Sequence, residues 1–101
     1  MKRRLELQIL LEEILGSRNV YFSPPESVKL KYPCIIYDKE DEIIRHADDI
    51  PYKRDDIYEV TVIDRNPDSD IPDKIAELPS CRFVRSFTSD NLSHHVYRLA
   101  F

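Results

Sequence analysis

The stretch YEVTVIDRNPDSDIPDKIAEL, residues 58–78, decides the expected fold, because a strand pattern runs through a polar turn directly into a short helix. Apolar side chains alternate along its first part, which is typical of a central strand with one apolar and one mixed face; they are Tyr58, Val60 and Val62. The turn 66–69, Asn-Pro-Asp-Ser, ends the strand. Nothing in the stretch looks like a nucleophile, a metal cage or a phosphate cradle, so the function must lie elsewhere in the chain.

Two helices are expected, one before and one after this strand. Residues 3–15 predict the first, because apolar side chains recur at helical spacing and Gly16 stands just past the last of them; the stripe is Leu7, Leu10, Leu11, Ile14 and Leu15. The second is expected to begin after Asp70 as its N-cap, with Asp73 three positions on, and to end before Pro79. Its apolar face would consist of Ile71, Ile75 and Leu78.

The remaining segments predict a connector and further strands. Residues 17–32, with Pro24-Pro25 inside, indicate an extended connector anchored by Tyr21 and Phe22. Residues 33–37 indicate a short buried strand. The final strands are expected over 82–88, with Phe83, Arg85 and Phe87 on one side, and over 94–101, joined by a turn at 89–91.

Residues 38–56 carry twelve charged side chains mixed with four apolar ones, which indicates a hairpin with an exposed arm and a tip near 48–51. The element order is therefore α-β-β-β-α-β-β. It predicts a single α+β domain over residues 1–101, with a mainly antiparallel sheet of about four to five strands and two helices on one face.

Composition excludes several classes of function. A net charge of −4 argues against general affinity for nucleic acid, which needs a basic face. Gly16 is the only glycine, which removes the phosphate-binding loops that need several. No apolar stretch approaches the roughly 20 residues that span a bilayer, and no signal-peptide pattern follows Met1, so the chain is expected in the cytosol. Cys34 and Cys81 fit no zinc or catalytic signature and are expected to be reduced and structural.

Four groups of residues resemble chemical sites. Positions 66, 68, 70 and 77 match a calcium-loop register, but Ile71 stands where that loop needs glycine, so a turn with a helix cap is favoured. His94 and His95 would point to opposite faces of a strand and could not chelate one metal. Glu59 and Asp64, with the acids 38, 40 and 41, would suggest a magnesium nuclease, but the strand lacks a companion lysine. No serine sits on a glycine-flanked elbow, so a catalytic triad has no support.

Exposed apolar residues are the remaining functional signal. Leu5 and Ile9 project away from the main stripe of the first helix. Either a covering loop or a contact between subunits would account for them. The four apolar side chains of the arm, including Ile50 and Tyr52, would likewise dock on a neighbour.

Much of the chain resembles a known family. The segments YPCIIY (32–37), DDIPY (48–52), YEVTVID (58–64), DSDIPDKIAELP (68–79) and RFVRSFTSDNLSHHVYRLAF (82–101) are similar to a recurring pattern in tail-terminator proteins. These are the tail-completion proteins of long-tailed phages and prophages of Gram-positive bacteria. The similarity covers most of residues 5–101 and consists of hydrophobic patterning and turns.

The resemblance implies a non-enzymatic protein that forms a ring, usually of six subunits, on the end of the tail tube. It implies that the ring stops tube polymerisation and joins the tube to the head connector, in the virion tail after assembly in the host cytoplasm. No cofactor, nucleic acid or membrane is implied as a partner. The expected contact residues, for other subunits or for the tube, are Leu5, Ile9, Arg45, Ile50, Tyr52, Lys53 and Arg54.

The ring model predicts a chain that is monomeric or weakly self-associating in dilute solution, because subunits must wait for the tube end. Two other functions remain open: a small metal-dependent nuclease and a generic adaptor that binds an unrelated protein. Neighbouring genes for a tail tube protein and a connector would favour assembly.

Overall fold

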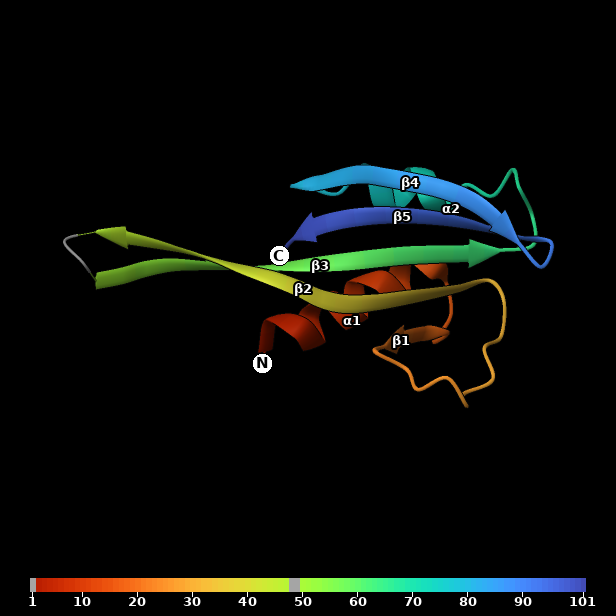
Figure 1. Ribbon diagram of the computed structural model, residues 1–101, viewed down its shortest axis with the longest axis horizontal. Coiled ribbons are helices and arrows are strands. Elements are labelled where there is room, and N and C mark those ends of the chain that lie inside the picture. The colour runs from red at the N-terminus through yellow and green to blue at the C-terminus, as the bar shows by residue number, and fades with distance from the viewer. Residues whose placement is uncertain (1, 48–49) are drawn as a thin grey trace.

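The central strand of the sheet is β3 (Ile50–Asp64), the strand that the alternating residues from Tyr58 onward predict. The computed structural model describes residues 2–47 and 50–101, and the side chains of residues 4–41 and 56–101. Five strands form one mixed sheet in the order β1-β2-β3-β5-β4 (Figure 1). The other elements are α1 (Lys2–Leu15), β1 (Val20–Phe22), β2 (Cys34–Ala47), α2 (Ile71–Ala76), β4 (Cys81–Ser89) and β5 (Leu92–Ala100). The predicted α+β class, a single domain with about five strands and two helices, is confirmed.

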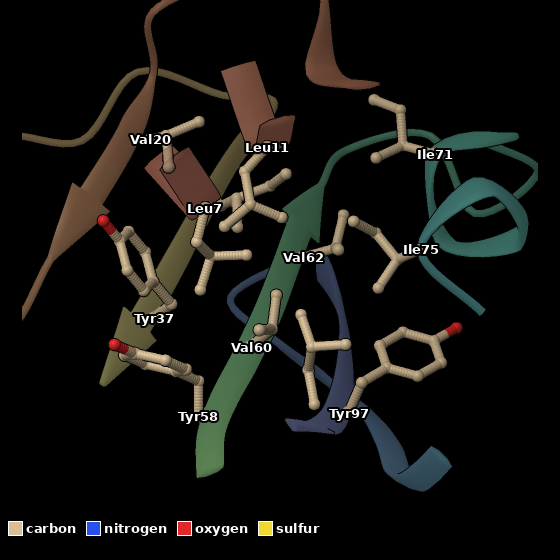
Figure 2. Close-up of a cluster of buried hydrophobic side chains, with 12 residues drawn as sticks. Leu7, Leu11, Val20, Tyr37, Tyr58, Val60, Val62, Ile71, Ile75 and Tyr97 are labelled. Carbon is tan, nitrogen blue, oxygen red and sulfur yellow. The ribbon is translucent and has the colours of Figure 1, made fainter. Parts of the chain in front are cut away.

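Both helices pack on the same face of the sheet, as predicted. Leu7 and Leu11 of α1 are completely buried against Val60 of β3, and Ile75 of α2 is buried beside Val62 (Figure 2). Fully burying one such aliphatic side chain contributes about 1.5–3 kcal/mol. The apolar stripe of α1 and the alternation of β3 therefore form one continuous core between the helices and the sheet.

The connector predicted over 17–32 contains the short strand β1, which the sequence did not predict. It pairs parallel with β2, with Val20 opposite Ile35, and makes the sheet mixed. Val20 is its buried side chain, whereas Phe22, an expected anchor, remains 39% exposed beside the ring of Tyr37. Three residues are too few for periodicity to indicate a strand.

The segments predicted as a short strand, a hairpin and a long strand are two continuous strands. β2 and β3 pair antiparallel from Cys34 opposite Ile63 to Ala47 opposite Ile50, with irregularities near Glu40 and after Arg45. β5 joins β3 only from Ile57 onward, so residues 41–47 and 50–56 form a two-stranded ribbon, here called the arm (Figure 1). The arm projects along the longest dimension of the molecule, 51 Å. The expected tip falls partly on residues 48–49, which lie outside the described residues.

Gly16 ends α1, as predicted. Its φ of +80° lies in the left-handed region, where a residue without Cβ is favoured, and its N–H donates to the carbonyl of Glu12 at 2.9 Å.

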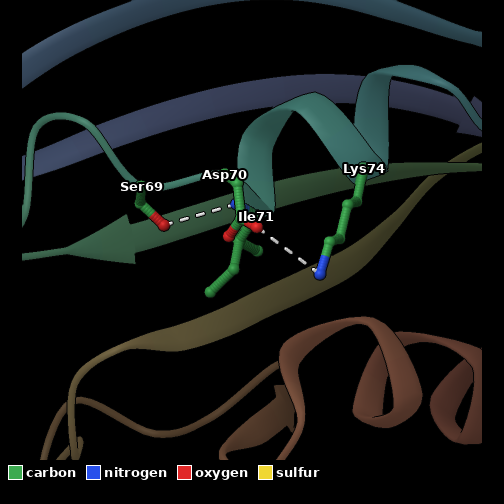
Figure 3. Close-up of polar contacts among 4 residues, drawn as sticks. All are labelled: Ser69, Asp70, Ile71 and Lys74. Carbon is green, nitrogen blue, oxygen red and sulfur yellow. Dashed lines mark hydrogen bonds and ion pairs between the residues drawn. The ribbon is translucent and has the colours of Figure 1, made fainter.

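Asp70 occupies the predicted N-cap position of α2, but it makes no capping hydrogen bond. Its carboxylate instead lies 3.6 Å from Nζ of Lys74 (Figure 3). The hydroxyl oxygen of Ser69 accepts the N–H of Ile71 at 3.3 Å. Asp70 already has helical dihedral angles, φ −87° and ψ −6°, whereas a capping residue is usually extended. In addition, Pro72 has no N–H to offer to the carboxylate.

β4 and β5 form a hairpin through Asp90 and Asn91, which both have positive φ, the signature of a tight two-residue turn. The expectation that Phe83, Arg85 and Phe87 share one side of β4 is wrong. The register shifts between Phe83, opposite Tyr97, and Arg85, opposite Val96. This bulge turns Phe83 to the helix face, while Arg85 and Phe87 lie on the other face.

Candidate assembly surfaces

The turn that matches a calcium-loop register uses its polar groups for its own hydrogen bonds. The carboxylate of Asp64 accepts the N–H of Asn66 at 3.0 Å, and the side-chain oxygen of Asn66 accepts the N–H of Asp68 at 3.0 Å. These bonds form consecutive Asx turns, which bring the chain round from β3 to α2. Within the described residues, no group of three or more His, Cys, Asp and Glu side chains could hold a metal ion.

The two adjacent histidines lie on opposite faces of β5. His94 stacks on Phe87 with ring centroids 4.6 Å apart and an angle of 11° between the rings, while His95 lies opposite Val62 of β3. They do not converge on one ion, as the alternation of a strand predicts.

The acids that would suggest a nuclease are also separated. Glu59 and Asp64 are five positions apart in one strand and therefore point to opposite faces. On the face away from the helices, Glu59 has Asp38 as its partner on β2 and Arg98 as its partner on β5. Arg98 also forms an ion pair with Glu40, with Nε 3.1 Å from Oε2. The positively charged side chain of Arg98 thus lies among the carboxylates that would have to bind a metal ion.

The two cysteines are free thiols in apolar surroundings. Cys34 is completely buried, and burial, assisted by the nearby carboxylate of Asp64, raises its pKa from 9.0 to about 11. Burial also raises the pKa of Cys81. Because the thiolate is the nucleophilic form, both shifts make these residues less reactive at neutral pH.

We expect the free energy of unfolding to fall as the pH rises from 9 to about 11. In that range the folded chain keeps the proton on Cys34 that the unfolded chain has lost, so folding becomes less favourable with increasing pH. The shift corresponds to at most about 3 kcal/mol. Urea unfolding at several pH values measures it, and Cys34→Ala should show a shallower fall. Equal slopes for both chains would contradict the assignment to this thiol.

Two predicted contact residues lie together on the outer side of α1. Leu5 is 53% exposed and Ile9 56% exposed, although both belong to a helix that buries its other side. Glu13 continues this stripe one turn further, and Glu6 lies beside it; both are exposed. No described loop covers these apolar side chains. They are called the α1 surface here: Leu5, Glu6, Ile9 and Glu13.

A second exposed apolar surface was not predicted. β4 is an edge strand, and every residue from 82 to 89 is exposed, including Phe83 at 57%, Val84 at 39% and Phe87 at 44%. Arg82 and Arg85 add positive charge, and the strand contains no acidic residue. These five residues are called the β4 surface here. The sequence signal was the stretch RFVRSF, but without the strand order nothing marked it as an edge.

The other predicted contact residues belong to the arm. Arg45 lies in β2, and the rest lie in β3; the backbone register places Arg45 opposite Lys53 and Ile50 opposite Ala47. The positions of Tyr52 and Arg54 are in the same part of β3. The side chains of these five residues lie outside those that the structure describes. The fold thus separates the predicted contact residues into two groups, one on α1 and one on the arm.

No helix in the described part of the chain is long and apolar enough to cross a membrane. Comparison with models of known protein families gives no match, and a search of curated proteins finds no significant relative.

Proposed function

We propose that this chain is a structural protein of phage tail assembly, which caps the tail tube as a ring, ends its polymerisation and joins it to the head connector. The observation that carries the proposal is the arm: a two-stranded ribbon extends beyond the rest of the sheet, outside the core formed by the helices and the other strands. Such an extension allows a protein at the end of a polymer to reach the next component. The resemblance in sequence to tail-terminator proteins supports the same function.

The body of the molecule, formed by the sheet and its two helices, is suited to a rigid ring subunit. A five-stranded sheet with helices on one face gives a rigid unit, and the α1 and β4 surfaces expose apolar side chains that are available for contacts between subunits. The proposed partners are further copies of the chain in a hexamer, the tail tube protein and the head connector. The site of action is the virion tail, after assembly in the host cytoplasm, and the proposal involves no bond-making chemistry and no cofactor.

The rival functions differ in what the described residues offer them. A metal-dependent nuclease needs converging acids, whereas Glu59 and Asp64 lie on opposite faces of β3. An adaptor would use exposed surfaces like those of a ring subunit, so the identity of the partner distinguishes it. No described feature favours either rival over assembly.

The decisive experiment is electron microscopy of particles made after deletion of the gene for this chain. Loss of a terminator should leave overlong tubes without heads, and supplying the chain from a plasmid should restore the normal length. Tails of normal length joined to heads would contradict the proposal. Magnesium-dependent DNA cleavage that Asp64→Ala abolishes would establish the nuclease instead.

A further inference from the structure

The α1 and β4 surfaces lie toward opposite ends of the sheet order. α1 packs beside β1 and β2, whereas β4 forms the opposite edge of the sheet, beyond β5 (Figure 1). For the α1 surface of one copy to meet the β4 surface of another across a twofold axis, both surfaces of each chain would have to lie in one contact. The separation of the surfaces favours a head-to-tail arrangement, in which each copy uses a different surface toward each neighbour.

The two surfaces are complementary in charge. From Leu5 to Glu13, α1 carries three acidic side chains and no basic one, and Glu6 and Glu13 are exposed. β4 carries Arg82 and Arg85 and no acidic side chain. None of these four exposed charges forms an ion pair with another described residue. Among the described side chains, each surface therefore carries exposed charges of the sign that the other lacks.

The two surfaces also match in apolar character. Leu5 and Ile9 are four residues apart on α1, which places their side chains about 6 Å apart along the helix axis. On β4, Phe83 is held edge-on against Tyr97 with ring centroids 5.7 Å apart, and the guanidinium of Arg85 lies 6.0 Å from the ring centre of Phe87. The contacts with Tyr97 and within β4 hold these exposed groups in place before any partner binds, which lowers the entropy lost on association.

The β4 edge itself indicates that it is covered in the assembled state. Exposed edge strands are usually protected by charged side chains, proline, a bulge or a covering segment, because their free N–H and C=O groups can pair with another chain. β4 carries two arginines and a bulge after Phe83, yet it has neither lysine nor proline and it exposes two phenylalanines and a valine. In the described part of the chain, no strand pairs with its outer edge.

We propose that the α1 surface of one copy binds the β4 surface of the next, so that copies associate head to tail. The inference rests on the proposed function, because it identifies the subunit contact of the proposed ring. Leu5 and Ile9 pack against Phe87, and Glu6 and Glu13 face Arg82 and Arg85, which lie with Phe87 on the sheet face away from the helices. Repetition of this contact closes a ring when the rotation per subunit divides a full turn.

Charge reversal tests the contact without disturbing the core. One variant carries Glu6→Arg and Glu13→Arg, and the other carries Arg82→Glu and Arg85→Glu; all four positions are exposed. Sedimentation velocity over a concentration series up to the solubility limit measures self-association. Each variant alone should associate on the order of tenfold or more weakly than the wild-type chain, because like charges then face each other.

Mixing the two variants in equal amounts should restore association. The intact α1 surface of one variant then meets the intact β4 surface of the other, and the two reversed surfaces also attract each other. An alternating ring of this kind closes only with an even number of subunits, as a hexamer has. A chain that carries all four reversals should also self-associate.

The matched control is Asp68→Arg with Glu77→Arg, which changes the net charge as much as the α1 variant does but at exposed positions outside both surfaces. It should associate like the wild-type chain. The contact is refuted if the wild-type chain never associates, if single variants associate like wild type, or if mixing restores nothing.

Tail morphology separates this inference from the proposed function. If the reversed chains still restore normal tail length in the deletion strain, the proposed function is supported and the proposed contact is refuted. If the variants associate as expected but deletion leaves tails of normal length, the contact is supported and the proposed function is refuted.

Discussion

A chain in which Asn-Gly replaces residues 43–55 is expected to fold normally but to bind tail-tube ends at least about tenfold more weakly, a loss of about 1.4 kcal/mol or more. The replacement removes the outer part of the arm, which the sheet does not need. Glu42 and Asp56 are opposite each other in the register, so a two-residue turn can connect them. Asn-Gly is the sequence that such turns prefer, because both central residues need positive φ.

The core residues all lie outside the replaced segment, from Leu7 to Tyr37 on one side and from Tyr58 to Leu99 on the other. The ion pair between Lys39 and Asp56, 3.5 Å apart, also remains at the base of the arm. The unfolding midpoint in urea should therefore change little. Sedimentation of the variant with purified tail tubes, followed by electron microscopy of the pellet, measures binding to tube ends.

A milder variant provides the control for this experiment. Lys53→Glu with Arg54→Glu keeps the length of the arm but reverses two of its predicted polar contacts. It should show a smaller loss of binding than the shortened chain does. Full activity of the shortened chain in capping tubes would show that the arm is not the docking element.

Tyr37→Ala is expected to lower the free energy of unfolding by about 3–5 kcal/mol, the cost of removing a large buried side chain. A domain of this size is stable by only about 5–15 kcal/mol, so a substantial part of that stability would be lost. Tyr37 is completely buried, and its ring contacts Phe22 and Tyr58 at centroid distances of 5.0 and 5.9 Å. Its hydroxyl donates to Gln8 and accepts from Arg4 at 3.2 Å, which connects β2 to α1.

Tyr37→Phe separates packing from hydrogen bonding at this position. The ring stays in place and only the two hydroxyl contacts with α1 are lost, so the expected cost is about 1 kcal/mol. Urea unfolding, followed by circular dichroism, compares both variants with the wild-type chain. If Tyr37→Ala cost no more than Tyr37→Phe, the ring would not be the packing centre that the structure indicates.

The sequence predicted those parts of the fold in which a periodic pattern is long enough to be read. The alternation from Tyr58 and the helical stripe from Leu7 each cover several repeats, so α1 and the second half of β3 were predicted within a few residues, whereas the first half of β3 was assigned to a separate hairpin. β1 was missed because Val20–Phe22 is a single repeat, and its pairing with β2 depends on a segment distant in sequence. The bulge near Val84 was missed because alternation gives no sign of an inserted residue.

The candidate surfaces were predictable only where one element determines them. Leu5 and Ile9 were found because a helix with one buried side must expose the other. Phe83 and Val84 were not found, because their exposure depends on β4 lying at the edge of the sheet. The order of strands in a sheet cannot be predicted from a local sequence pattern. The arm residues were placed on a hairpin, but their side chains lie outside the described ones, so their role as contacts stays a prediction.

The continuity of β3 from Ile50 to Asp64 means that the arm and the body share one backbone without a linker. A pull along the arm would therefore load the hydrogen bonds between β3 and its neighbours in shear, and many of them would have to break together. Bonds loaded in parallel resist force better than bonds that open one after another. In the proposed function, this arrangement would strengthen the joint between tail tube and head connector against pulling forces.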